Sequence, residues 1–277
     1  MRTAVSCEPP MRPGRGLLHE AIQEALRTVL RNYARLAILE IGLGRRFLYI
    51  HAENDVLGLA FAPQTEPLPA WLVEGNHTLE EVASLAWSHP LLSSAALAAV
   101  NAATAALIDE HGIDAVDARH GVDVGAVIAA TWPKARTAIV GYVPGVAQAL
   151  RKHGLSITVY EDNEHHRREA ESDGFQVFPG RQLIADIDNY ELVVATGASL
   201  LDPLVVTATQ MAGTGLAIVG PTSSFHPAVA ARLGASVLGG SYVPPEKREK
   251  VLRLVKAGQG FRRIRGYVAK WTWWRRG

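Results

Sequence analysis

The chain has 277 residues, enough for two ordinary domains or one large one, and two domains are expected. Hydrophobic residues make up 48% and charged residues 20%, which is typical of a globular protein and excludes a disordered or fibrous chain. Lys and Arg number 28 against 27 Asp and Glu, so no overall field attracts nucleic acid. The single cysteine, Cys7, excludes an intramolecular disulfide and a cysteine-based zinc site, and favours a cytoplasmic location.

The N-terminal half predicts a small α+β domain over residues 16–112, after a flexible, Pro- and Arg-rich tail at 1–15. Residues 17–35 carry apolar side chains at the spacing of an amphipathic helix. Three short apolar runs then predict a meander of strands whose last two form a hairpin, at 36–41, 47–51 and 56–61. The segment 90–108 is uncharged and owes its apolarity mostly to alanine, so we expect a helix over 90–110 that is buried inside the protein and no membrane span.

The C-terminal half predicts a Rossmann-like doubly wound domain over residues 135–277, joined to the first domain by a linker region at 113–134. Strand-like runs alternate there with helical ones, which is typical of a parallel sheet with helices on both faces. The strand-like runs are 137–140, 156–160, 175–178, 191–196, 215–219 and 236–238. The fold class is therefore α/β, with the smaller α+β domain in front.

Three turns of this domain are predicted to form a ligand site, because ligands of open α/β sheets bind beyond the carboxyl ends of the strands. Each turn combines glycine, which lets backbone amides approach a ligand, with polar side chains that can donate to an anion. The expected ligand-binding residues are Gly141, Tyr142, Pro144 and Gly145 in the first turn, Thr196, Gly197 and Ser199 in the second, and Gly220, Pro221, Thr222 and Ser223 in the third.

Glu161 follows the second strand of this domain, 20 positions after Gly141. Dinucleotide-binding units place an acid at this offset on the ribose hydroxyls, which favours a nucleoside-containing ligand such as S-adenosylmethionine or a nucleotide. The turn itself reads Gly-x-x-x-Gly, and Pro144 removes one amide donor, so NAD is the weaker candidate. A solvated strand end is the structural alternative for Glu161.

Tyr142 and His226 are the catalytic candidates, because both can transfer protons from positions inside these turns. His226 is also the candidate ligand for a divalent transition metal, with helix capping as its alternative role. The adjacent His165 and His166 point to different sides of a helix or a strand, so they are not expected to share an ion. The sequence does not distinguish a binding protein from an enzyme.

The C-terminal segment concentrates positive charge and aromatic rings. Residues 253–277 contain eight basic residues and no acid, interleaved with Phe261, Tyr267, Trp271, Trp273 and Trp274. We expect a final edge strand with its apolar side chains inward, alternating over residues 261–270. A nucleic-acid or partner-binding tail is the alternative, and an apolar, tryptophan-rich surface also suits a homodimer.

Several stretches resemble a known family. TAIVGYVPGVAQALRKHGLSITVYE at 137–161, VVATGASLLDPLV at 193–205 and the segment 216–258 resemble the DUF364 family, described as "putative heavy-metal chelation". Upstream, VLGLAFAP at 56–63 and HPLLSSAALAAVNAAT at 89–104 resemble the DUF4213 domain. The resemblance implies an enolase N-terminal-like domain followed by a Rossmann-like domain, with a cleft between them.

The same resemblance adds Asn101 to the site and maps the family's motifs onto eight turn residues, namely Tyr142, Pro144, Gly145, Thr196, Gly197, Gly220, Pro221 and Thr222. A buried amide needs hydrogen-bond partners, so Asn101 either ties two elements together or points into the cleft, and we expect the cleft. The leading hypothesis is a protein or enzyme whose interdomain cleft binds an anionic or metal-chelating small molecule. The alternative is a transferase, lyase or cyclase that uses S-adenosylmethionine or a nucleotide.

Overall fold

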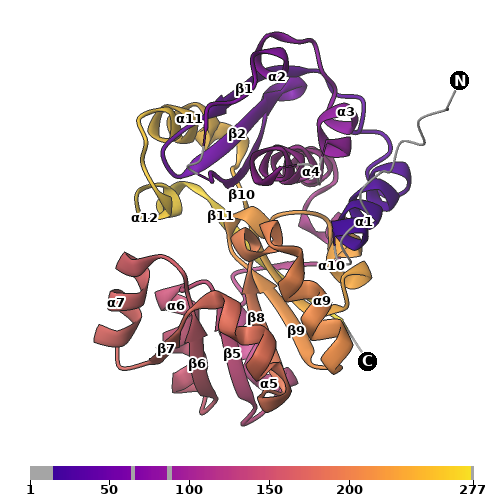
Figure 1. Ribbon diagram of the computed structural model, residues 1–277. Coiled ribbons are helices and arrows are strands. Elements are labelled where there is room, and N and C mark those ends of the chain that lie inside the picture. Colours follow the sequence, from indigo (N-terminus) through magenta and orange to yellow (C-terminus); the bar gives the residue numbers. More distant parts are fainter. Residues whose placement is uncertain (1–14, 64–65, 86–88, 276–277) are drawn as a thin grey trace, which may run out of the picture.

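Two β-sheets organise the chain, one of three strands and one of eight (Figure 1). The structure is a computed structural model that describes residues 15–63, 66–85 and 89–275. Cys7 and nearly all of the expected N-terminal tail lie outside these residues.

The smaller sheet is an antiparallel meander in the order β1-β2-β3, formed by β1 (Ile38–Leu43), β2 (Phe47–Ala52) and β3 (Val56–Phe61). The strands and the hairpin were predicted from the apolar runs. Its helices are α1 (Arg15–Arg27), α2 (Ala70–Glu74), α3 (Leu79–Ser84) and α4 (Pro90–His111). Helix α1 ends earlier than predicted, because Leu30 N donates to Ala25 O, five residues back, and closes the helix in turns.

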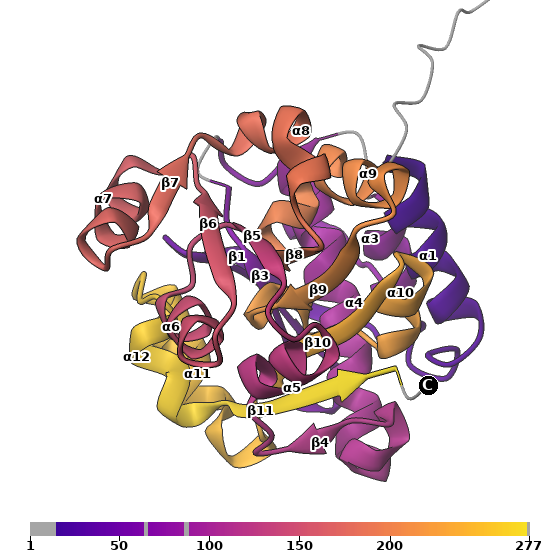
Figure 2. The same cartoon turned by 90° about the horizontal axis from the view of Figure 1, so that it is seen from below.

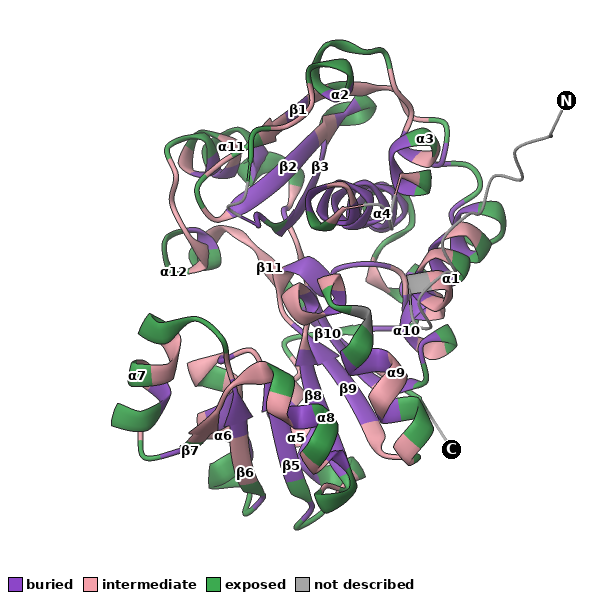
Figure 3. Ribbon diagram, viewed as in Figure 1, coloured by how far each residue is buried: buried purple, intermediate pink, exposed green. Residues whose placement is uncertain are grey.

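Helix α4 packs directly on β3 and forms the centre of the N-terminal core (Figure 3). Gly58 in β3 permits this contact, since a Cβ there would lie 2.7 Å from Ala102 N and closer still to Ala98 O. The helix is long and apolar enough to cross a membrane, but 89% of its most apolar window is buried inside the protein. It is therefore a core helix, as its alanine-rich composition predicted.

The larger sheet is mostly parallel, in the order β4-β11-β10-β9-β8-β5-β6-β7 (Figure 2). Its six parallel strands are β5 (Arg136–Val140), β6 (Ser156–Tyr160), β7 (Gln176–Phe178), β8 (Leu192–Thr196), β9 (Gly215–Val219) and β10 (Ala235–Tyr242). Read by their rank in the sequence from β7 to β10, they run 3-2-1-4-5-6, the strand order of dinucleotide-binding doubly wound sheets. The winding direction reverses between β5 and β8.

Helices cover both faces of this sheet, so the predicted α/β class is confirmed. One face packs on α5 (Val124–Thr131), α6 (Pro144–Lys152) and α7 (Glu164–Ser172). The other packs on α8 (Leu183–Asp186), α9 (Pro203–Ala212) and α10 (Pro227–Arg232). Successive side chains of β5 point to opposite faces of the sheet, as expected of a strand. Ile139 packs with the first group of helices, and Ala138 and Val140 pack with the second.

The C-terminal segment differs from the predicted edge strand. Residues 261–264 form the short helix α12 (Phe261–Ile264), and the strand β11 (Ala269–Trp274) begins only after it. Strand β11 is antiparallel to β10 and is itself covered by the two-residue strand β4 (Arg119–His120), so it is not the edge. Trp271 is 1% exposed and Trp273 is 8% exposed, which places these rings in the core and argues against their stacking on bases.

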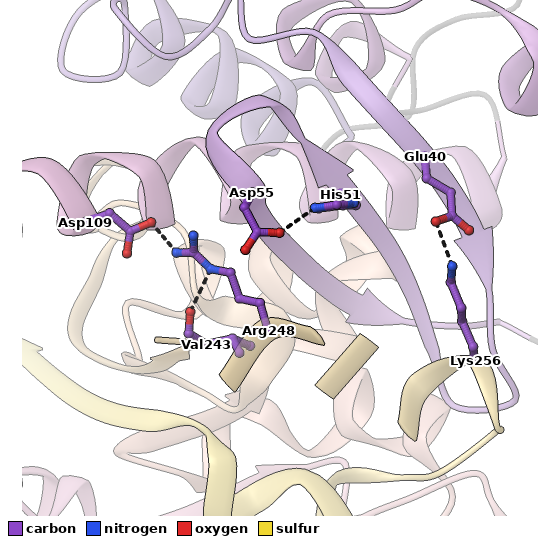
Figure 4. Close-up of polar contacts among 7 residues, drawn as sticks. All are labelled: Glu40, His51, Asp55, Asp109, Val243, Arg248 and Lys256. Atoms are coloured by element: carbon purple, nitrogen blue, oxygen red, sulfur yellow. Dashed lines mark hydrogen bonds and ion pairs between the residues drawn. The ribbon is translucent and has the colours of Figure 1, made fainter. Parts of the chain in front are cut away.

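Helix α11 (Arg248–Lys256) returns to the N-terminal sheet and covers the face opposite α4 (Figure 1). Val251 and Val255 pack there with Leu57 and Leu59 of β3. Two ion pairs border this contact, Glu40 with Lys256 and Asp109 with Arg248 (Figure 4). The segment after β10 thus shares a core with the first half of the chain.

Candidate functional site

The three predicted turns meet at the carboxyl edge of the parallel sheet. A Cβ on Gly141, whose φ is 82°, would lie 2.5 Å from Thr196 Oγ1, so the first and second turns touch. A Cβ on Gly197 would lie 2.7 Å from the carbonyl carbon of Thr222 and closer to Ser223 N, so the second and third turns touch as well. Gly141 is required by its positive φ and by the closeness of the Thr196 side chain, and Gly197 is required because backbone atoms of the third turn occupy the space of a side chain.

Tyr142, a catalytic candidate from the sequence, has its side chain buried and its hydroxyl bonded within the protein. Its side chain is 6% exposed, its hydroxyl donates to the carboxylate of Asp173, and its ring packs edge-on against Phe175. Burial, followed by the hydrogen bond to Asp173, raises the pKa of the Tyr142 hydroxyl. The group is therefore a buried, bonded phenol, and this geometry argues against proton donation to a ligand at the turns.

Glu161 bridges the first turn and the loop after β6. Its carboxylate accepts hydrogen bonds from Tyr142 N at 2.8 Å and Asn163 N at 2.8 Å, and it lies 3.5 Å from His166 Nδ1. Burial alone would raise the pKa of Glu161, but the bonds from His166 and the two backbone amides lower it overall. An anion at the first turn would meet this carboxylate, so the structure does not favour the predicted anion site there.

The hydroxyl groups of the other two turns mainly stabilise the turns themselves. Ser199 Oγ donates to Thr196 O, and Thr196 Oγ1 accepts from Ser199 N. Ser223 Oγ donates to Gly220 O, and Thr222 Oγ1 accepts from Phe61 N at 2.9 Å. The hydroxyl protons of Ser199 and Ser223 are thus already donated to backbone carbonyls, unlike the predicted role in binding an anion.

His226 caps helix α10, which was the alternative to a catalytic or metal-binding role. Its Nδ1 accepts from Ala228 N at 3.1 Å, and its ring also bonds to the backbone of Ala115. Burial lowers the pKa of His226 to about 4, although the bond to Ala115 opposes the change. Both bonds are structural, so this geometry argues against the predicted metal and catalytic roles.

This cap predicts a pH dependence of stability. The unfolded chain protonates His226 near its ordinary pKa of 6.5, whereas the folded protein does so only near pH 4. The contribution of the neutral ring is therefore complete above pH 6.5 and is lost as the pH falls through 4, on the order of 3 kcal/mol in all. We expect His226→Asn, which keeps a capping oxygen, to lose this part of the dependence in denaturant titrations across that range. An unchanged pH profile in the variant would contradict the assignment.

No group of three His, Cys, Asp or Glu side chains suited to hold a metal ion occurs among residues 15–63, 66–85 and 89–275. The rings of His165 and His166 lie near the start of α7 with their centroids 5.8 Å apart and their planes tilted by 50°, without such a group around them. The described side chains therefore do not fit a metal held by the protein alone.

Asn101 ties α4 to both β3 and the third turn. Its Nδ2 donates to Leu59 O at 2.7 Å and to Thr222 O at 3.0 Å. Ser94 of the same helix donates to Phe61 O, so the third turn, β3 and α4 form one hydrogen-bonded unit. Asn101 is 3% exposed, and its Oδ1 is buried without a partner. Asn101 therefore links two structural elements, which was one of the two roles predicted from the sequence. Its side-chain oxygen, Oδ1, is left without a hydrogen-bond donor.

A cleft lies beside Asn101, between the three-stranded sheet and the C-terminal segment. Its walls come from β3, α4, the third turn, the end of β10 and the roof segment, which we define as residues 258–268. The lining residues are Leu57, Leu59, Asn101, Ala105, Pro221, Ser224, Ser241, Tyr242, Val243, Phe261, Ile264 and Val268. The cleft has clear space for only about one water molecule.

Most of these residues were not predicted from the sequence. Of the expected site residues, Asn101 and Pro221 line the cleft, and Thr222 is bonded to Asn101. The first turn, with Tyr142, Pro144, Gly145 and Glu161, is not among its walls. Ser241 and Tyr242 lie at the carboxyl end of β10, a position that the rule for parallel sheets could have flagged. Burial raises the pKa of the Tyr242 hydroxyl.

The sequence profile of DUF364, described as "putative heavy-metal chelation", matches residues 126–274, more than half of the chain. A DUF364 protein of unknown function from Pyrococcus horikoshii superposes with a TM-score of 0.71 at 17% identity, covering 93% of this chain and 100% of its own. A second, from Desulfitobacterium hafniense, gives 0.69 at 17% identity, covering 92% and 99%.

No curated protein matches the chain. The two structural relatives are too different in sequence to show more than a shared fold, which extends over both sheets. The profile match over the second half, together with that fold, leads to one conclusion: the chain belongs to the DUF364 family.

Proposed function

We propose that the protein binds a small molecule in the cleft beside Asn101. The observation that carries the proposal is the cleft itself, which five separate segments line and which includes Pro221 of the third turn, at the carboxyl edge of the parallel sheet. Ligands of doubly wound sheets bind at that edge, and pockets form preferentially between structural units. The binding site is thus displaced from the first turn toward the third.

A metal would reach this cleft as part of a chelate. The family description names heavy-metal chelation, yet the described residues contain no three-ligand group of His, Cys, Asp and Glu. A chelate carries its own donor atoms, so it needs only shape and hydrogen bonds from the protein. The proposed ligand is therefore a small organic molecule that can itself coordinate a divalent transition metal.

Binding requires the roof segment to move, because the closed cleft has space for about one water molecule. Ile264 fills the cleft from above, while Arg262, Arg263 and Arg265 are exposed. The segment is held from outside by an ion pair between Arg262 and Glu169, in which the Arg262 side chain is 77% exposed. Exposed pairs contribute about 0–1 kcal/mol, so they oppose opening only weakly.

Thermal denaturation tests the proposal. We expect Ni²⁺ or Cu²⁺ citrate and histidine chelates to raise the melting temperature more than the same metal or the same chelator alone. Equal stabilisation by the free metal would show that the protein supplies the metal ligands and would contradict the chelate. No stabilisation by any chelate at millimolar concentration would remove the main support for the cleft.

A nucleoside-containing ligand such as S-adenosylmethionine is the second candidate. The strand order is that of dinucleotide-binding sheets, and Glu161 stands after the second parallel strand. The carboxylate already accepts two backbone amides, so a ribose would have to share it. Adenosine and S-adenosylmethionine are the corresponding arms of the same denaturation experiment, and stabilisation by these molecules alone would favour this candidate.

Three further assignments belong to this proposal. The resemblance of residues 56–63 and 89–104 supports a DUF4213 domain with an enolase N-terminal-like fold over residues 16–112. The single cysteine supports a cytoplasmic location. A homodimer through the C-terminal segment stays a prediction, carried by its partly exposed rings Phe261, Tyr267 and Trp274. Trp271 and Trp273 are buried, so they do not offer rings on which nucleic-acid bases could stack.

A further inference from the structure

The orientation of the Asn101 amide is fixed by its partners. Nδ2 lies within hydrogen-bond distance of two carbonyl oxygens, those of Leu59 and Thr222. A flipped amide would place Oδ1 against both of these acceptors and would lose both bonds. The atom left over is therefore Oδ1, an acceptor.

This acceptor lacks a donor within the described structure. Oδ1 is buried and unpartnered, and a buried unpaired acceptor costs about 1–3 kcal/mol. Ser224, the hydroxyl residue of the third turn among those that line the cleft, already donates to Pro221 O and accepts from Ser241 N. Asn101 itself lines the cleft, so its unpaired acceptor lies within the wall of a space that holds about one water-sized group.

The walls select against a charged group at this point. Among the described residues, no Asp, Glu, Lys or Arg lines the cleft. The ion pair between Asp109 of α4 and Arg248 of α11, next to the wall residue Val243, is internally balanced. An anionic group would be repelled by the side-chain oxygen of Asn101, Oδ1. An ammonium group would be buried without a carboxylate to balance its charge. Apolar residues dominate the remaining walls, among them Leu57, Leu59 and Ile264.

We propose that Asn101 Oδ1 binds a neutral hydrogen-bond donor of the ligand, a hydroxyl or an amide N–H group, carried next to an apolar part that packs on Leu57, Leu59 and Ile264. This assignment rests on the proposed function. It names the chemistry of the end of the ligand that enters the cleft first. Any metal-coordinating group of the ligand then lies outside this apolar end.

Four matched probes test the assignment: benzyl alcohol and benzamide, which carry a neutral donor, and benzyl methyl ether and benzoate, which do not. We expect the first two to raise the melting temperature and to shift the ¹⁵N–¹H signal of the Asn101 side-chain amide. We expect the ether and benzoate to bind at least about tenfold more weakly, because Oδ1 stays unpaired. Equal binding of benzoate and benzamide would overturn the assignment.

Two variants complete the test. Asn101→Leu should abolish the preference for the donor probes, and Val243→Ile, which adds one methyl group to the cleft and keeps Asn101, should abolish their binding. Retained binding of the donor probes in Val243→Ile would show that they bind outside the cleft and would overturn the proposal. Stabilisation by chelates without any response to the donor probes would overturn this inference and leave the proposed function intact.

Discussion

Asp109→Ala should lower the free energy of unfolding by about 3 kcal/mol or more. Arg248 is 3% exposed, and its guanidinium donates to the carboxylate of Asp109 and, through Nε, to Val243 O at 3.1 Å (Figure 4). Removing the carboxylate leaves a buried cation without its counter-charge. Urea titration of the variant and the wild type measures the difference.

The ion pair between Glu40 and Lys256 is the matched control. It also ties helix α11 to the N-terminal half, through β1 instead of α4, but its two side chains are 40% and 44% exposed. Glu40→Gln should therefore cost less than about 1 kcal/mol. An equal decrease in the free energy of unfolding in the two variants would contradict the claim that burial makes the Asp109–Arg248 pair the more important one. Because Arg248 holds Val243, a wall of the cleft, we also expect Asp109→Ala to weaken binding of the chelate probes.

Gly197→Ala should destabilise the protein by about 2–3 kcal/mol and should also weaken ligand binding. The added methyl group would lie 2.7 Å from the carbonyl carbon of Thr222 and closer to Ser223 N, and both are backbone atoms. The second and third turns must separate to admit it. Thr222 O would then move away from Asn101, which donates to it at 3.0 Å. Thermal denaturation with and without the chelate probes separates the two effects.

Gly145→Ala is the control for this substitution. A Cβ on Gly145 meets no atom within 4 Å, and the residue lies in the first turn of α6, where alanine is the better helix former. We expect its stability to stay within about 0.5 kcal/mol of the wild type or to rise. If Gly145→Ala lost as much stability as Gly197→Ala, the contact between the second and third turns would not be the cause of the destabilisation.

Most of the fold could be predicted from local patterns in the amino-acid sequence. Short apolar runs bounded by turn residues marked β5, β6, β8 and β9 to within about one residue, because central strands of a parallel sheet are apolar on both faces. The three glycine turns met at one edge because parallel strands place their carboxyl ends together. Helix α4 was recognised as buried from its alanine content.

Less of the candidate site could be predicted, because its geometry depends on contacts between segments that are far apart in the sequence. Nothing local to residues 248–268 indicates that α11 covers the N-terminal sheet and that Ile264 fills the cleft. The side chains of Tyr142 and His226 stand in turns that suit catalysis, but Asp173 and Ala115, far along the chain, engage them. The free acceptor on Asn101 became visible only once both carbonyl partners of its amide nitrogen were known.

A native mass spectrum of the purified chain, compared with Ser241→Phe, measures occupancy of the cleft most directly. Ser241 lines the cleft and is partly exposed, and a phenylalanine there needs far more room than one water molecule, so it blocks the space that a ligand would enter. The account predicts a bound small molecule in the wild type that the variant has lost. The same adduct in both proteins, or none in either one, would contradict it.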